Sequence, residues 1–97
     1  MSRRYVLVRI FSTAPVTEEQ FAKATTASIL TYFGEIGLSR ISPKLIRFDS
    51  RRSSAVLAVA KDYIVEMQTA LALIGQIGET DASILPLKMS GTIKGVS

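Results

Sequence analysis

Apolar residues recur at alternate positions in four short stretches of the chain, which is the pattern of β-strands; in the third stretch the positions between them are apolar as well. These stretches cover residues 5–11, 44–49, 54–61 and 83–90. Only a polar Asp-Ser-Arg-Arg-Ser turn separates the second from the third, so these two are expected to form a hairpin with a basic tip. Pro86 cannot donate a backbone hydrogen bond, which indicates that the last strand lies at a sheet edge.

Two longer stretches repeat apolar residues at helical spacing. The first helix is expected to begin at Thr17, which opens a Thr-x-x-Gln capping box, and to run to about Gly34. A further helical turn fits residues 38–41, and the second helix is expected to have Asp62 as its N-cap and to end near Gly75. The predicted apolar faces are Phe21, Ala22, Ile29, Tyr32, Phe33 and Ile36 in the first helix and Tyr63, Ile64, Met67, Ala70, Leu71 and Ile74 in the second.

The predicted order of elements is β-α-β-β-α-β, which is the plan of the ferredoxin-like (RRM-like) sandwich. We therefore expect an α+β fold in which a four-stranded antiparallel sheet carries both helices on one face, and a single domain over residues 1–97. Strand alternation assigns Val6, Val8, Ile10, Ile46, Phe48, Leu57, Val59, Leu85, Leu87 and Met89 to the helix-covered face. It assigns Tyr5, Leu7, Arg9, Phe11, Leu45, Arg47, Ala58 and Lys88 to the open face.

The composition excludes several kinds of chemistry. Cys, His, Asn and Trp are absent, so the chain has no disulfide, thiolate nucleophile, Cys/His zinc site or imidazole base. Its eight carboxylates are scattered, and no feature pairs two of them. We expect no catalytic residue, no metal or cofactor bound by the protein itself, and no enzymatic activity of the chain alone.

The overall balance of residues is that of a folded domain, with 47% hydrophobic and 21% charged residues. No charge-free stretch approaches the roughly 20 residues of a membrane-spanning helix. The N-terminal residues contain no apolar signal region. A cytoplasmic location without membrane contact is therefore expected.

Positive charge is concentrated in three segments. The net charge is +4, and residues 1–16, 40–61 and 85–97 hold eleven of the twelve Lys and Arg residues with one carboxylate, Asp49. Basic side chains on one sheet face suit the phosphates of a folded RNA, although such charge can also serve solubility alone. The basic hairpin tip fits either an RNA groove or a solvated turn. The candidate RNA-binding residues are Arg9, Arg47, Arg51, Arg52, Lys88, Ser90 and Lys94.

The third strand does not carry the base-stacking signature of a standard RNA-recognition motif. It reads Ser-Ala-Val-Leu-Ala-Val-Ala, without an aromatic residue. Tyr5 and Phe11 on the first strand could stack on bases, but aromatic residues at strand ends more often only pack. The expected contacts are therefore mainly to phosphates.

Five short stretches, in the right order, resemble the ribonuclease P protein component 2 family of small Pop-type proteins. They are Arg-Tyr-Val-Leu-Val-Arg-Ile (4–10), Phe-Gly-Glu-Ile-Gly (33–37), Lys-Leu-Ile-Arg-Phe-Asp (44–49), Ala-Leu-Ala-Leu-Ile (70–74) and Ser-Gly-Thr-Ile-Lys (90–94). The resemblance covers nearly the whole chain, and the short form is typical of archaeal members. The sequence departs from the family at Ala58, where many members are basic, and in stopping at Ser97, where many continue with a basic tail.

The resemblance implies a subunit of ribonuclease P, a ribonucleoprotein endonuclease that removes the 5′ leader of precursor tRNA. In that family the RNA subunit is catalytic and holds the magnesium ions. The resemblance also implies pairing with ribonuclease P protein component 3, with two such pairs forming a heterotetramer that supports the catalytic RNA. The competing interpretation is a stand-alone ferredoxin-like regulatory or oligomerisation domain without nucleic acid.

The second helix offers a candidate surface for the protein partner. Its interior carries only Glu66 as a charge, so its apolar stripe is wider than a sheet-facing side requires. The predicted partner contacts are Val65, Thr69, Ala72 and Leu73, at the outer margins of that stripe. The alternative surface is the first helix and its bend at residues 34–38.

Overall fold

The computed structural model describes residues 2–96, so Met1 and Ser97 lie outside the described residues. Its elements are β1 (Arg3–Ser12), α1 (Glu18–Ile41), β2 (Lys44–Asp49), β3 (Ser54–Ala60), the 3-10 turn η1 (Lys61–Tyr63), α2 (Ile64–Ala72), β4 (Gln76–Ile77), β5 (Thr80–Ser90) and the 3-10 turn η2 (Lys94–Val96). The strands form an antiparallel sheet in the order β2-β3-β1-β5-β4. The sheet has five strands rather than the predicted four, because β4 pairs with the start of β5.

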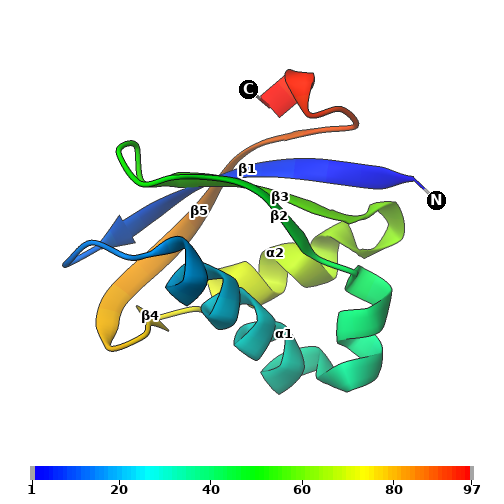
Figure 1. The fold of residues 1–97 in the computed structure, drawn as a ribbon. Coiled ribbons are helices and arrows are strands. Elements are labelled where there is room, and N and C mark those ends of the chain that lie inside the picture. The colour runs from blue at the N-terminus through cyan, green and yellow to red at the C-terminus, as the bar shows by residue number, and fades with distance from the viewer. Residues whose placement is uncertain (1, 97) are drawn as a thin grey trace.

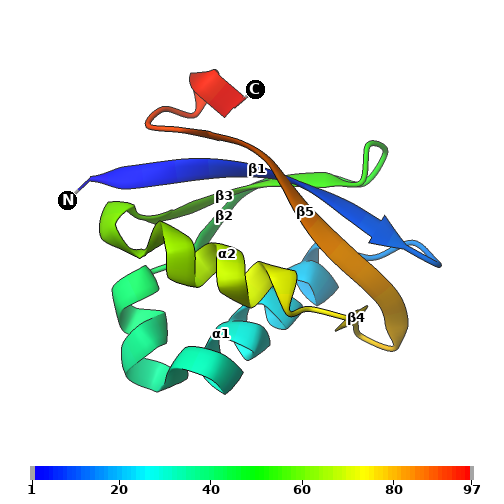
Figure 2. The same ribbon diagram turned by 180° about the vertical axis from the view of Figure 1, so that it is seen from behind.

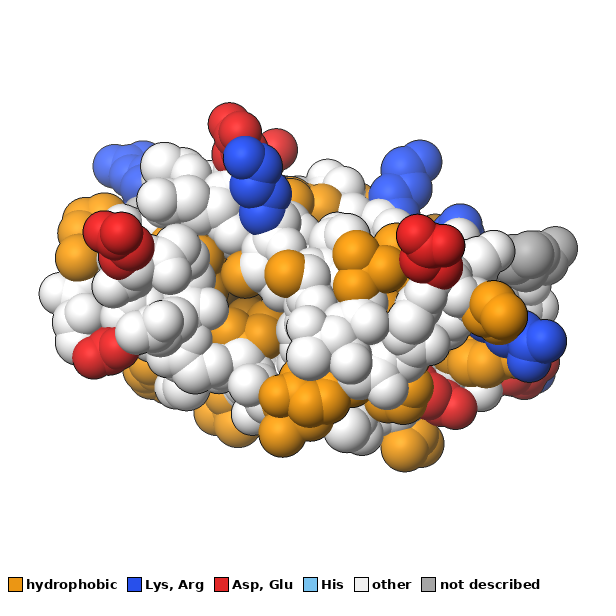
Figure 3. Space-filling view, turned by 90° about the horizontal axis from the view of Figure 1, so that it is seen from below, with side chains coloured by type: hydrophobic (Ala, Val, Ile, Leu, Met, Phe, Trp, Pro, Cys, Tyr) orange, Lys and Arg blue, Asp and Glu red, His pale blue; other side chains and the backbone are white. Residues whose placement is uncertain are grey.

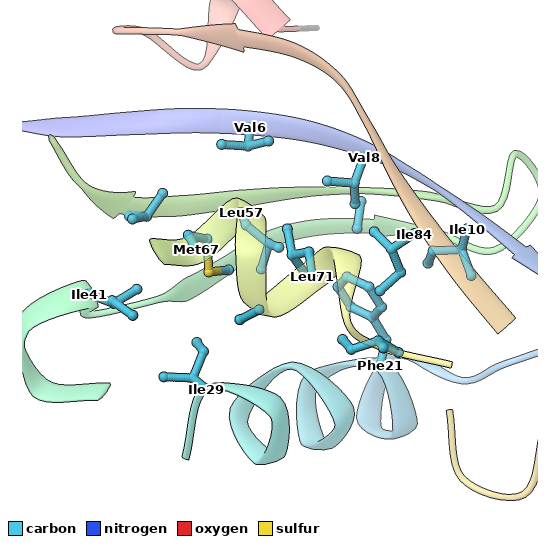
Figure 4. Packing of buried hydrophobic residues seen from close by; sticks show 14 of the residues in the cluster. Val6, Val8, Ile10, Phe21, Ile29, Ile41, Leu57, Met67, Leu71 and Ile84 are labelled. Atoms are coloured by element: carbon cyan, nitrogen blue, oxygen red, sulfur yellow. The ribbon is translucent and has the colours of Figure 1, made fainter. Parts of the chain in front are cut away.

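Both helices cover one face of the curled sheet, and the C-terminal turn lies on the other (Figures 1 and 2). The hydrophobic core fills the space between helices and sheet (Figure 4). Its buried members include Val6, Val8 and Ile10 of β1, Leu57 and Val59 of β3, Phe21 and Ile29 of α1, and Met67 and Leu71 of α2. The sides predicted for β1 and β3 are thus confirmed. No helix within residues 2–96 is long and apolar enough to cross a membrane.

A β-bulge changes the sides of residues in β2. The register against β3 shifts between Leu45 and Arg47, so Ile46 is an extra residue on this strand. Leu45 therefore lies opposite Leu57 and packs against the core, whereas the sequence placed it on the open face. The predicted core position of Ile46 is wrong as well, while Phe48 packs against the core as expected.

The last strand is the second place where simple alternation fails. Ile84 is the buried residue of β5, and the register against β1 shifts farther along the strand. Leu85 lies opposite Arg9, on the face away from the helices, and Leu87 lines a groove on that face. The helix-facing prediction is therefore wrong for Leu85 and Leu87. Met89 lies opposite Val6, on the predicted side, but is 46% exposed.

The first helix begins as its sequence predicts and breaks at a glycine. Thr17 Oγ1 accepts a hydrogen bond from the Gln20 amide at 3.1 Å, and Gln20 Oε1 accepts one from the Thr17 amide at 3.0 Å. Gly34 has φ 71° and ψ −175°, which is outside the helical region and is open to glycine at little cost. The chain then resumes a helix that ends at Ile41, so the predicted extra turn is confirmed.

Three helix details differ from the prediction. Tyr32 and Ile36 are exposed rather than buried, since Tyr32 borders an unfilled groove between α1 and the end of α2, and Ile36 follows the break in the helix. Asp62 is not an N-cap, because it lies inside η1 and α2 has no side-chain cap. The second helix is also shorter than predicted: it begins at Ile64 and ends at Ala72.

A buried hydrogen bond ties the two helices together. Ser28 Oγ, on α1, donates to the backbone carbonyl of Ala70 at 2.6 Å. This carbonyl lies in the last turn of α2, where backbone acceptors run out of partners within the helix. The Leu73 amide bonds to the Thr69 carbonyl and the Ile74 amide to the Leu71 carbonyl, so Ser28 supplies the donor for the carbonyl between them.

Replacing Ser28 with alanine is expected to lower the free energy of unfolding by about 1–3 kcal/mol, because a buried carbonyl loses its partner. Thr31→Ala is the control, since its hydroxyl is exposed and bonds within its own helix to Ala27, at 2.8 Å; it should change stability by roughly 0.5 kcal/mol or less. Urea unfolding of both variants makes the comparison. Equal effects would show that the bond between the helices contributes nothing.

Candidate nucleic-acid interface

The face of the sheet away from the helices has an apolar, covered centre. As predicted, the β1 residues that point there are Tyr5, Leu7, Arg9 and Phe11. Val56 and Ala58 of β3 lie opposite Leu7 and Tyr5, on the same face, yet both are only 1% exposed. The predicted direction of Ala58 is thus correct, but its methyl group is not available to a partner. Basic residues surround this centre rather than occupying it.

The C-terminal stretch Ser-Gly-Thr-Ile-Lys builds a compact turn on this face. Ser90 Oγ accepts a hydrogen bond from the Thr92 amide at 3.2 Å, and Thr92 Oγ1 accepts one from the Gly95 amide at 3.1 Å. The turn lies on the side of the sheet away from the helices (Figure 1), and Val96 within it is 1% exposed. Gly95 has no room for a side chain, because a Cβ atom there would collide with Ser90 Oγ.

Three arginines from separate segments come together beside this turn. They line a groove of about 490 Å³, which we call the arginine groove. Its lining residues are Leu7, Arg9, Arg47, Asp49, Arg52, Ser54, Leu87 and Val96. The arginines come from β1, β2 and the hairpin tip, so the fold gathers charges that are dispersed in the sequence. Three guanidinium groups in one groove suit an anionic ligand with several oxygens.

Asp49, the one carboxylate that lines the arginine groove, is hydrogen-bonded to backbone amides. Asp49 Oδ1 accepts hydrogen bonds from the amides of Arg51 and Arg52, at 3.0 and 3.2 Å, and so fixes the hairpin tip. Within residues 2–96 the only ion pair joins Lys23 to Glu19, at 3.4 Å, on the exposed surface of α1. The guanidinium groups of the groove therefore have no carboxylate at ion-pair distance in this part of the chain.

The other predicted RNA-binding residues lie around the groove rather than in it. Arg51 lines a second hollow beside it, together with Phe11. Lys88 lies on the same face of β5, and Lys94 is exposed in the C-terminal turn, but neither lines the arginine groove. Ser90 is part of the hydrogen bonding inside the turn, a structural role that the sequence could not separate from RNA contact.

The apolar part of the groove was missed from the sequence. Leu7, Leu87 and Val96 all line it. Leu87 was assigned to the opposite face because the bulge in β5 interrupts the alternation, and Val96 gives no local signal, since its contacts come from the folding back of the chain. Alternation along β1 does place Leu7 on this face.

The predicted partner residues lie on the outer side of α2. Val65 and Leu73 are 71% and 49% exposed, and Thr69 and Ala72 are exposed as well. Seen from the helix side, the surface has apolar side chains among scattered acidic ones and a hollow floored by apolar groups (Figure 3). No group of three or more His, Cys, Asp or Glu residues that could hold a metal ion occurs within residues 2–96.

Comparisons with known proteins agree with a small RNA-associated domain. The model of the Rpp14/Pop5 family of ribonuclease P proteins matches residues 4–97. Ribonuclease P protein component 2 of Aeropyrum pernix is 30% identical over 95 residues, covering 96% of this chain and 77% of that protein. The Thermococcus gammatolerans protein of the same name is 29% identical over 91 residues, covering 94% and 76%. The chain belongs to the Rpp14/Pop5 family, which confirms the resemblance seen in its sequence.

A solved structure has the same fold. A chain in the cryo-EM structure of yeast ribonuclease MRP aligns with a TM-score of 0.76, covering 94% of this chain and 75% of that one. Its sequence identity is 10%, so the likeness concerns the fold alone.

Gly95→Ala is expected to release the C-terminal turn, because the new methyl group cannot coexist with Ser90 Oγ in the observed geometry. The free energy of unfolding should fall by no more than the burial of Val96 contributes, which is about 1.5–3 kcal/mol. Gly75→Ala is the matched control, since a Cβ atom there meets no atom within 4 Å. Amide hydrogen exchange at Val96 should accelerate in Gly95→Ala alone; unchanged exchange would contradict the described docking of the turn.

Proposed function

We propose that this chain is a protein subunit of ribonuclease P that binds the RNA subunit with the face of the sheet away from the helices. The convergence of Arg9, Arg47 and Arg52 in one groove is the observation that carries the proposal. Guanidinium groups bind phosphate oxygens in pairs, and phosphate contacts supply most of the affinity of proteins for RNA. Family membership and the two archaeal relatives support the same assignment.

In this proposal the RNA performs the cleavage that removes the 5′ leader of precursor tRNA. The magnesium ions belong to the RNA, and the protein contributes positive charge that positions it. The side chains of the arginine groove fit this role, because guanidinium groups bind phosphate oxygens in pairs. We also propose a cytoplasmic location for the chain.

The proposed assignment extends to the fold plan. The succession of strands and helices, with the sheet order β2-β3-β1-β5, supports a ferredoxin-like plan. The two-residue strand β4 is then an addition at the sheet edge. In such a plan the helix layer and the free sheet face are available to two different partners.

The outer side of α2 is the surface that we assign to ribonuclease P protein component 3. Val65, Thr69, Ala72 and Leu73 form this patch, and two of its four residues are large exposed hydrophobic residues. None of the four patch residues is charged, and depletion of charged residues is typical of the centre of protein interfaces. Two such pairs would form a heterotetramer, with the RNA-binding faces on the side opposite the patch.

Removing arginines from the groove and from the adjoining hairpin tip should weaken RNA binding and flatten its dependence on salt. Each of Arg9→Ala and Arg47→Ala should reduce the slope of log K against log salt by about one unit, and the Arg51/Arg52 double alanine variant by about two. Cleavage by reconstituted ribonuclease P should keep its position, because phosphate contacts do not read sequence. Binding of the RNA subunit at several salt concentrations gives the slopes.

Glu18→Gln is the control for these variants, since Glu18 is exposed on the helix layer. Its neutralisation should leave the slope unchanged. Wild-type binding by all three arginine variants, with altered binding by Glu18→Gln, would assign the RNA to the helix layer. An RNA affinity that is weak and insensitive to salt would favour a domain without a nucleic acid partner.

A charge in the α2 patch should disrupt pairing with component 3. Ala72→Asp and Leu73→Asp place a carboxylate on an exposed, apolar surface, so each should weaken pairing at least tenfold without unfolding the chain. Titration of purified component 3, monitored by calorimetry, measures the affinity, and urea unfolding checks the fold. Normal pairing of both variants would show that the interface lies on another surface, and α1 with its bend at Gly34 would be the next candidate.

A further inference from the structure

The arginine groove combines two kinds of lining that a plain phosphate site does not need. Arg9, Arg47 and Arg52 supply charge, whereas Leu7 and Leu87 supply an apolar wall that is backed by the buried Val96. Leu87 is 51% exposed, so a large part of this wall is open to a ligand. The groove volume of about 490 Å³ lies in the range of sites for small organic ligands.

A second hollow adjoins the groove and repeats this combination. It is an open depression that is lined by Arg9, Ile10, Phe11, Ser12, Arg51, Arg52 and Ser53. Phe11 is 50% exposed, so it offers apolar surface beside these arginines. Arg9 and Arg52 line both hollows and therefore stand at their boundary.

The pairing of charge with exposed apolar surface distinguishes between forms of RNA. An RNA duplex offers phosphates and 2′-hydroxyl groups on its outside and keeps the faces of its bases stacked inside, so it would leave both apolar surfaces empty. An unpaired stretch offers a phosphate and, on either side of it, a base whose face can lie on an apolar or aromatic side chain. The two hollows, joined at two arginines, match that alternation of base, phosphate and base.

We propose that the two hollows bind two consecutive unpaired nucleotides of RNA. Arg9 and Arg52 bind the phosphate that joins the nucleotides. One base lies against Leu7 and Leu87, and the other stacks on Phe11. This inference rests on the proposed RNA-binding function and adds that the form of RNA bound here is single-stranded.

The test compares two probes on the full chain by fluorescence anisotropy: labelled decauridylate and a ten-base-pair RNA duplex with the same label. Leu87→Ser and Phe11→Ala should each weaken decauridylate binding roughly fivefold or more, because each removes a contact to a base. Both should leave duplex binding within about twofold of wild type, since phosphate contacts remain. Arg9→Ala should weaken binding of both probes.

Leu30→Ser and Tyr32→Ala are the matched controls, since Leu30 and Tyr32 are exposed side chains of similar kind on α1. Both controls should bind decauridylate like the wild type. Phe11→Leu serves as a second variant that keeps apolar bulk but lacks the ring; it should retain stability and lose part of the decauridylate affinity.

The outcomes separate the inference from the function on which it rests. If Leu87→Ser and Phe11→Ala affect both probes equally, or neither probe, while Arg9→Ala weakens both, the single-strand site is refuted and the RNA-binding face stands. If Arg9→Ala also leaves both affinities unchanged, the proposed RNA-binding function itself fails. Selective loss of decauridylate binding supports the inference.

Discussion

The alternation of side chains along β1 is the constraint on which the rest of the structure depends. This strand is central, with β3 on one side and β5 on the other. Val6 and Val8 are fully buried against the helices, which fixes Leu7 and Arg9 on the opposite face. A slip of one residue would move Arg9 into the core, where an unpaired charge is very costly. The hydrophobic core and the basic face are therefore two sides of one strand register.

The order of elements and most of the core could be predicted from local patterns. The Thr17 capping box, the break at Gly34 and the buried side of β1 each have a signal within a few residues. The sides of β2 and β5 could not be predicted fully, because each strand carries a β-bulge. Ile46 and Leu87 are as apolar as core residues, so nothing in the local sequence shows which residue the bulge turns outward.

The candidate site was predictable as a set of charges but not as a groove. Segregation of Lys and Arg along the chain indicated which strands would carry the basic face. The groove itself depends on two long-range events, the hairpin tip approaching β1 and the docking of Val96 on the sheet. Asp49 is a second example. In the sequence it is a lone acidic residue among basic ones, and in the structure its carboxylate accepts hydrogen bonds from the Arg51 and Arg52 amides and so fixes the turn that carries Arg52.

Photo-cross-linking in assembled ribonuclease P tests most directly whether RNA lies on the sheet face. Leu85, half exposed and opposite Arg9, and Glu19, exposed on the outer side of α1, are each replaced by a photoreactive amino acid. Cross-links to the RNA subunit are expected from position 85 and none from position 19. Cross-links from position 19 with none from position 85 would contradict this placement of the RNA, because the helix layer would then be the RNA-binding surface.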